Sequence, residues 1–164
     1  MPVPGRFAVR LAKEDFKFSS AHFTLFADAP AELLHGHNYR VEVELEGEHL
    51  DGAGLLLDIG AVKRRIRERC ARLDERTLLP EKNPAVQISE SGGQIEVRFE
   101  GRSYALPARD ALRLPVQNVS MELLAQMLWE EVAEVLRGTR VESMTLTLHE
   151  TAGQSCSYRA ALRD

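Results

Sequence analysis

The length, composition and charge of the chain exclude several classes of protein. Its 164 residues suffice for one domain with a sizeable core, and 44% hydrophobic with 28% charged residues is typical of a soluble globular protein. The net charge of -4 gives no reason to expect a nucleic acid as partner, and no apolar run approaches the ~20 residues of a membrane-spanning helix. Two cysteines are too few for a disulfide framework, and the N-terminus lacks an apolar signal-peptide core. We therefore expect a cytoplasmic protein with two free thiols.

The first part of the chain has the patterns of extended strands. Residues 7–23 predict one long strand with an irregularity near residues 13–15. Residues 39–46 alternate strictly, with Val41, Val43 and Leu45 on one side and charged side chains on the other. A period of two is typical of a half-buried strand.

Two amphipathic helices are predicted from apolar residues at helical spacing. The first follows Asp58, a candidate N-cap, and the second runs from about Ser120 to Arg137, with Gly138 at the position of a C-cap glycine. The apolar stripes that define them comprise Ile59, Val62, Ile66, Cys70 and Leu73 in the first, and Leu124, Met127, Leu128, Val132 and Val135 in the second.

The remaining segments complete an α+β pattern. Residues 143–149 and 157–162 are strand-like, so strands flank the helices, which favours an antiparallel sheet covered by helices on one face. Between the helices, Gly92-Gly93 and Gly101 separate short alternating runs and predict an inserted β-meander. We expect this insert, residues 80–116 of a single domain spanning 1–164, to form an additional surface or a sheet that contacts another subunit.

Three histidines give the first indication of chemistry. His35 and His37 flank a glycine, and residues two apart on an extended segment project from the same face. His22 ends the preceding strand, and a connection of twelve residues can bring it beside the pair. Three neutral imidazoles with one open position are typical of a catalytic zinc site. An H-x-H pair taken alone is more often an accident or a hydrogen-bonded pair than a metal site.

Five motifs extend this pattern and carry a resemblance to a known family. They are F-S-S-A-H at 18–22, L-H-G-H-N-Y at 34–39, L-L-D-I at 56–59, S-M-E-L-L-A at 120–125 and L-H-E-T at 148–151. In this order and at these intervals they resemble the 6-pyruvoyltetrahydropterin and 6-carboxytetrahydropterin synthase family. The resemblance covers about residues 7–79 and 117–162, and the predicted β-meander lies between these ranges.

The resemblance implies a fold, a metal and an assembly. The fold is the tunnelling fold, a four-stranded antiparallel sheet with two helices on one face, whose subunits join into an oligomeric barrel. The metal is Zn²⁺, held by His22, His35 and His37. The ion coordinates hydroxyls on the side chain of a dihydroneopterin triphosphate. Family analogy and the open edges of such a sheet lead us to expect a homotrimer or homohexamer.

The resemblance also implies a substrate-binding set. A family glutamate that corresponds to Glu150 anchors the pterin, because a carboxylate accepts parallel hydrogen bonds from the ring N–H and the exocyclic amine. Without the resemblance, Glu150 is a surface charge at the end of a strand, with His149 on the opposite face. Ser120 and Glu122 correspond to residues near the pterin pocket, although capping and the helix dipole also favour both in an ordinary first turn.

Two departures from the family fall on the catalytic residues. The usual general base is a cysteine at the position of Ala31, which cannot accept a proton. Glu32 resembles the glutamate of a family branch that shortens the pterin side chain, and it is either that base or a solvated loop charge. The usual Asp-His pair is Asp74-Glu75 here. These carboxylates either divide acid and base roles or are plain charges at the end of the first helix.

The sequence therefore predicts a zinc-dependent lyase acting on a 7,8-dihydroneopterin phosphate, a small-molecule pterin. Its candidate catalytic residues are Glu32, Asp74 and Glu75. The alternative is a zinc- and pterin- or purine-binding homologue that has lost the standard synthase activity. A third interpretation is a structural assembly subunit with a relic metal site.

Overall fold

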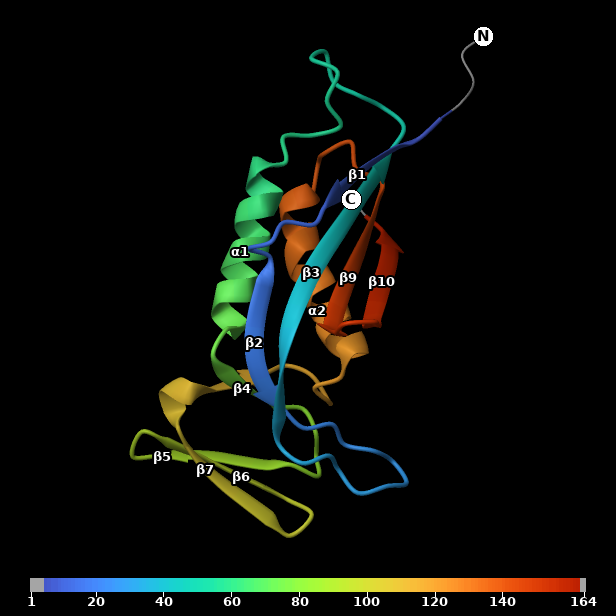
Figure 1. Cartoon of the computed structure of the whole chain (residues 1–164). Coiled ribbons are helices and arrows are strands. Elements are labelled where there is room, and N and C mark those ends of the chain that lie inside the picture. The colour runs from blue at the N-terminus through green and yellow to red at the C-terminus, as the bar shows by residue number, and fades with distance from the viewer. Residues whose placement is uncertain (1–4, 163–164) are drawn as a thin grey trace.

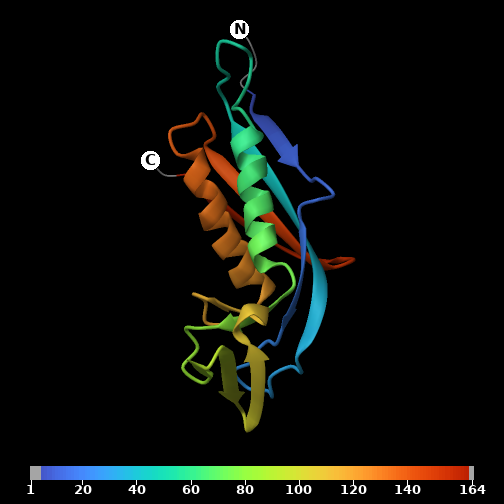
Figure 2. The ribbon, with the colours of Figure 1, turned by 90° about the vertical axis from the view of Figure 1, so that its left-hand side faces the viewer.

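The computed structural model describes residues 5–162 and consists of a large sheet, two helices and a smaller sheet at one end (Figure 1). The helices α1 (Gly60–Leu73) and α2 (Met121–Ala133) lie side by side on one face of the large sheet (Figure 2). Neither these helices nor any other described segment forms a helix long and apolar enough to cross a membrane.

The large sheet has seven strands in the order β10-β9-β3-β2-β4-β8, and β1 also pairs with β3. The strands β10, β9, β3 and β2 form an antiparallel set, which confirms the predicted four-stranded core. Two short strands, β4 and β8, extend it in parallel and were not predicted. The strand bounds are β1 (Phe7–Leu11), β2 (Lys17–His22), β3 (His35–Gly47), β4 (Arg76–Pro80), β8 (Ala111–Leu114), β9 (Ser143–Thr151) and β10 (Gln154–Ala161).

The long first strand predicted over residues 7–23 is in fact two strands. β1 pairs with the second half of β3, so that Phe7 lies opposite Gly47, whereas β2 pairs with the first half, so that His22 lies opposite His35. The break at residues 12–16 coincides with the predicted irregularity, because a turn there lets Phe16 enter the core completely.

The helix ends differ in part from the prediction. Asp58 is not the N-cap of α1; Ile59 takes that position without a side-chain cap, and the Asp58 Oδ1 accepts a hydrogen bond of 2.8 Å from the Gly60 amide. Ser120 does cap α2, where its Oγ accepts from the Leu123 amide. α2 is shorter than predicted, because a 3₁₀ turn, η2 (Glu134–Leu136), replaces its last turn.

The helical stripes and the alternating strand residues form the main core. Val62, Ile66 and Leu73 of α1 are fully buried and belong to the same cluster as Val43 and Leu45 of β3. Because apolar burial is worth roughly 25 cal/mol per Å², this layer supplies most of the stability of the fold. Cys70 is part of the cluster as well. Burial raises the pKa of its thiol to about 12, so it is an unreactive core residue.

The inserted β-meander is confirmed, and it packs on a second hydrophobic core that is separate from the main one. β5 (Gln87–Ser91), β6 (Gln94–Phe99) and β7 (Arg102–Pro107) form a three-stranded antiparallel sheet, and a 3₁₀ turn, η1 (Ala108–Asp110), leads back to β8. This second cluster contains Phe23, Ala31, Leu79, Val86, Ile95, Val97, Phe99 and Ala111.

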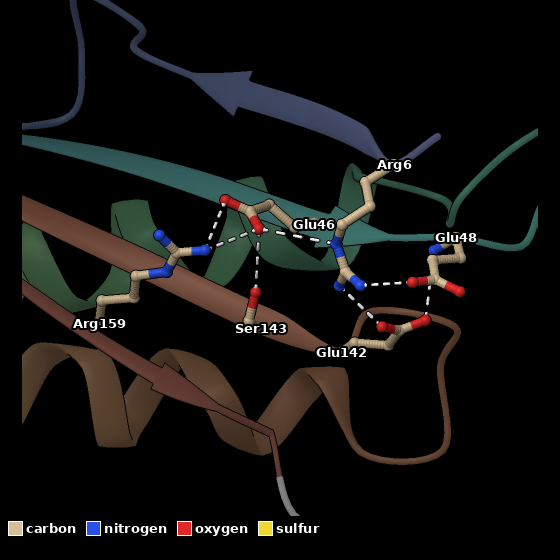
Figure 3. A network of polar contacts seen from close by, with 6 residues as sticks. All are labelled: Arg6, Glu46, Glu48, Glu142, Ser143 and Arg159. Carbon is tan, nitrogen blue, oxygen red and sulfur yellow. Dashed lines mark hydrogen bonds and ion pairs between the residues drawn. The ribbon is translucent and has the colours of Figure 1, made fainter. Parts of the chain in front are cut away.

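Arginine–carboxylate pairs gather near the start of β1 (Figure 3), at the end of the large sheet opposite the insert (Figure 1). Arg6 contacts Glu48 and Glu142 at 2.7 Å each, and Arg159 contacts Glu46 at 2.9 Å. Exposed pairs of this kind are individually worth about 0–1 kcal/mol. Arg6 thus links the segment before β1 to residues next to β3 and β9, and Arg159 links β10 to β3.

Candidate metal and substrate site

Three histidines lie close together on the helix-covered face of the sheet, next to the segment that precedes α2. On β2 the side chains of Phe18, Ser20 and His22 alternate onto the helix-covered face. The antiparallel register places His35 opposite His22, and His37 follows two residues later on the same face of β3. The strand pairing alone thus brings the three rings together.

The geometry of these rings suits a metal ion. One ligand atom from each of the three residues lies within 4.8 Å of the others. His22 is 2% exposed and its Nδ1–H donates to the Val119 carbonyl at 2.8 Å, while the His35 Nδ1–H donates to the Leu33 carbonyl at 2.7 Å. Such bonds fix the tautomer and leave each Nε2 lone pair free for a metal.

Electrostatics keep His22 ready to bind a cation. Its buried Nε2 has no hydrogen-bond partner among the described residues, which is costly unless a ligand satisfies it. Burial, which outweighs the Val119 bond and the nearby Glu150, lowers the pKa of His22. The ring is therefore neutral at pH 7, as a metal ligand must be.

Glu150 is not a surface charge at the end of a strand. It is 8% exposed, and its Oε1 lies 3.3 Å from the His22 Nε2 and 3.5 Å from the His37 Nε2. The Tyr39 hydroxyl donates to Oε1 at 3.3 Å, and the Gln154 amide donates to Oε2 at 3.0 Å. Burial, together with the Glu150 charge, raises the pKa of Tyr39, so the phenol stays protonated and acts as a donor.

Its neighbour in sequence, His149, lies on the other face of β9. Its Nε2 is 3.4 Å from the Glu42 Oε1, on the polar face of the sheet. The period of two predicted this separation, and His149 has no part in the histidine cluster.

Glu32 lies at the edge of the cluster, in the connection between β2 and β3. Its Oε2 accepts from the Thr24 amide at 3.1 Å and is 3.9 Å from the His35 Nε2. Desolvation favours the neutral acid, but the Thr24 hydrogen bonds and the nearby histidines outweigh it and lower the pKa of Glu32. The preceding residue, Ala31, points into the second core and is 5% exposed. An ionised carboxylate therefore lies next to the candidate metal site.

A cavity of about 310 Å³ joins these groups to the start of α2. Ser120 and Glu122 both line it, although Ser120 also acts as the helix cap. Sequence analysis did not predict that Phe26 lines this cavity, because the residue is 48% exposed and has no periodic pattern around it. The lining comprises Thr24, Phe26, Glu32, His35, His37, Ser120, Met121, Glu122, Glu150 and Gln154.

Asp74 and Glu75 are not part of this cavity. Asp74 caps the end of α1, and its Oδ1 accepts from the Ser19 amide at 2.7 Å. Glu75 has a positive φ of 56°, and its amide donates to the Ser19 carbonyl at 2.7 Å. Glu75 lines a wider, open cavity of about 790 Å³ that also contacts His37 and Glu150, whereas Asp74 faces a different depression.

Comparisons with known proteins find similarity to tetrahydropterin synthases. A family model described as 6-pyruvoyl tetrahydropterin synthase matches residues 10–161. A protein of Methanocaldococcus jannaschii with the provisional name 6-carboxy-5,6,7,8-tetrahydropterin synthase is 28% identical over 149 residues, which cover 89% of this chain and 91% of the relative.

Two solved proteins share the fold along nearly their whole length. A Plasmodium falciparum 6-pyruvoyl tetrahydropterin synthase superposes with a TM-score of 0.88 at 23% identity, covering 95% of this chain and 98% of its own. A Plasmodium vivax protein of the same name gives 0.85 at 28% identity, with 96% and 99% covered. The P. vivax protein has also been solved with a glutamate, described as a catalytic residue, replaced by alanine, at 0.84 and 27% identity over the same shares.

Proposed function

Because the chain belongs to the 6-pyruvoyl tetrahydropterin synthase family, we propose that it is a zinc-dependent lyase that shortens the side chain of a 7,8-dihydroneopterin phosphate. The observation that carries this proposal is the Glu32 carboxylate, 3.9 Å from His35 at the edge of a three-histidine cluster. The family's members are lyases, and the choice among their reactions depends on the base.

Three imidazole nitrogen donors with space beside them favour zinc, because a catalytic zinc typically has three protein ligands and one exchangeable position. His22, His35 and His37 would hold the ion. When bound, zinc would supply Lewis acidity that makes side-chain hydroxyls of the substrate easier to deprotonate. The carbonyls of Val119 and Leu33 keep two of the rings in the required tautomer.

Glu150 would bind the pterin ring. Its carboxylate lies inside the site, where it can accept hydrogen bonds from the ring N–H and the exocyclic amine of a pterin or guanine-like heterocycle. Tyr39 and Gln154 each donate to one of its oxygens and hold the carboxylate plane in place. Ser120 and Glu122, which line the same cavity, would contact the bound substrate.

Glu32 would be the general base. The residue before it, Ala31, has no group that accepts a proton, whereas the ionised Glu32 carboxylate can take one from a side-chain hydroxyl next to the carbon–carbon bond that breaks. The catalytic glutamate of the P. vivax protein supports this assignment, because a carboxylate serves the chemistry of that relative.

The two remaining carboxylates are placed unequally for catalysis. Glu75 shares the wider cavity with His37 and Glu150, so it is the better candidate for a proton transfer. Asp74 is engaged by the Ser19 amide and would act by fixing the turn that carries Glu75.

The product of 7,8-dihydroneopterin triphosphate tests the reaction. We expect the zinc-loaded protein to release a 6-hydroxymethyl pterin, identified by mass spectrometry. A 6-pyruvoyl product, which keeps all three side-chain carbons, would contradict side-chain cleavage while retaining the family chemistry. A 6-carboxy product would retain cleavage of the side chain but would contradict the expected hydroxymethyl product. Absence of turnover with several pterins, but with binding in calorimetry, would instead establish the binding homologue, and absence of binding would establish a structural subunit.

We also propose that the chain works in the cytoplasm as a homotrimer or homohexamer. Both thiols are free, which suits a reducing compartment. β10 ends the large sheet, and its outer edge has no partner strand among residues 5–162, so a neighbouring subunit would complete it. We expect light scattering at micromolar concentration to give a mass three or six times that of the chain. A monomeric mass would refute the assembly.

A further inference from the structure

The loop that carries Glu32 is fixed by side chains from the β6–β7 hairpin of the insert. The Arg102 Nη1 donates to the Glu32 carbonyl at 2.7 Å, and its Nη2 donates to the Ala31 carbonyl at 2.8 Å. The Glu100 carboxylate accepts from the Ala31 amide at 2.9 Å. The Glu32 amide donates to the Thr24 carbonyl at 3.0 Å. Every backbone donor and acceptor of the Ala31–Glu32 pair is therefore bonded.

This degree of satisfaction is unusual for an irregular connection. A loop without regular structure ordinarily bonds to water and moves more than the elements it joins. Here a planar guanidinium reaches two successive carbonyls, which the single charge of a lysine cannot match in geometry. Arg102 is itself held, since its Cζ lies 5.4 Å from the centre of the Phe99 ring.

The insert also packs against both ends of the same connection. Phe23 directly follows His22, and its ring stacks on Phe99 with the centroids 4.1 Å apart. Ala31 directly precedes Glu32 and is buried in the same cluster. The second core thus supports the backbone beside one histidine and beside the candidate base.

Glu100 occupies a position that its backbone does not favour. Its φ is 48°, and Gly101 follows at 73°, so the hairpin turn has positive φ at both central residues. Asparagine, aspartate or glycine is usual at the first of these positions, and a bulkier residue there costs of order 1 kcal/mol or more. The carboxylate that binds the Ala31 amide offers a reason for glutamate at this site.

We propose that the insert is a positioning device for catalysis, in which Arg102 and Glu100 hold the Ala31–Glu32 backbone so that the Glu32 carboxylate stays at the metal site. This inference rests on the proposed function, because it gives Glu32 the role of base. Arg102 and Glu100 are positioning residues and not catalytic residues, since their own contacts are with the loop.

The test compares Arg102→Ala with Arg98→Ala, a matched control. Arg98 is an exposed arginine on β6 that pairs with Glu96 and does not contact the loop. We expect Arg102→Ala to lower kcat about 10- to 100-fold, as misplacement of a catalytic group by about 1 Å does. KM and zinc content should stay near those of the unmodified protein, because the proposed contacts of Glu150 and the histidines are unchanged. Arg98→Ala should behave as the unmodified protein.

Two further variants separate positioning from folding. Glu100→Gln retains an oxygen that can accept from the Ala31 amide, so it should keep most of kcat. Glu100→Ala has no such oxygen, so its kcat should fall. Equal kcat for Arg102→Ala and Arg98→Ala would overturn the proposal. So would a loss of kcat that is accompanied by a loss of zinc or of cooperative unfolding, because that would be a structural role.

Amide hydrogen exchange tests the same inference without turnover. In Arg102→Ala the amides of Ala31 and Glu32 should exchange at least about tenfold faster than in Arg98→Ala, since local opening becomes easier. If the unmodified protein converts no pterin, the proposed function fails, and exchange alone decides whether the insert holds the loop. Unchanged protection at both amides would overturn the positioning role whatever the activity.

Discussion

Bound zinc is expected to disappear when His35 and His37 are both replaced by alanine. Only His22 would then remain of the three imidazoles, and one neutral nitrogen donor cannot hold the ion against dilution. We expect elemental analysis after dialysis to fall from about one zinc ion per chain to a background level. The fold should persist, because His35 and His37 are partly exposed and lie outside both hydrophobic clusters.

The control for this experiment is His49→Ala. His49 is an exposed residue in the loop after β3, at the end of that strand remote from His35, and its removal should leave the zinc content unchanged. Unchanged zinc in the double variant would show that the ion binds elsewhere. Acidification should also release the ion, because protons compete for the imidazoles. Since burial lowers the pKa of His22, that ring resists protonation to a lower pH than an ordinary histidine does.

Periodicity was enough to predict the main layers of the fold. The alternation of Val41, Val43 and Leu45 predicted the central strand, and the spacing of Val62 and Ile66 predicted a helix with one buried face. These patterns are local, because a strand or helix half exposed to water must repeat its apolar residues with its own period.

Elements without a period of their own were missed. β4 contributes the buried pair Leu78 and Leu79, and β8 is only four residues long. Such short runs pair in parallel with strands far away in the sequence, so their neighbours decide their structure. The break between β1 and β2 was placed only roughly for the same reason, since the register with β3 sets it.

The site likewise contains residues that a local pattern predicted and residues that it did not. His22, His35 and His37 carry a recognisable spacing, and strand register then brings them together. Tyr39, next along the same face of β3, has the spacing of a core residue and gives no local sign that its hydroxyl reaches Glu150. Arg102 acts on a backbone seventy residues away, a contact that no local pattern encodes.

Turnover should depend on Glu32 far more than substrate binding does. Glu32→Gln retains an oxygen that can accept the Thr24 N–H bond, so the loop should remain in place, but the amide cannot take a proton. We expect kcat to fall about 10²- to 10⁴-fold, the usual contribution of a general base. Glu32→Ala should do the same and also release the Thr24 amide. Zinc content and calorimetric affinity for the pterin product should stay close to those of the unmodified protein.

Two matched variants make this prediction specific to Glu32. Asp28 is an exposed carboxylate in the same connection, and Asp28→Ala should leave kcat unchanged. Glu150→Gln should show the opposite pattern to Glu32→Gln, with weakened pterin binding, because its amide group would offer a donor where the heterocycle needs an acceptor. If Glu32→Gln turned over as fast as Asp28→Ala, proton abstraction would have to come from another group, and Glu75 would be the next to replace because it shares a cavity with His37 and Glu150. A loss of binding in Glu32→Gln would instead make this carboxylate a ligand of the substrate, and the separation between the base and the pterin anchor would no longer hold.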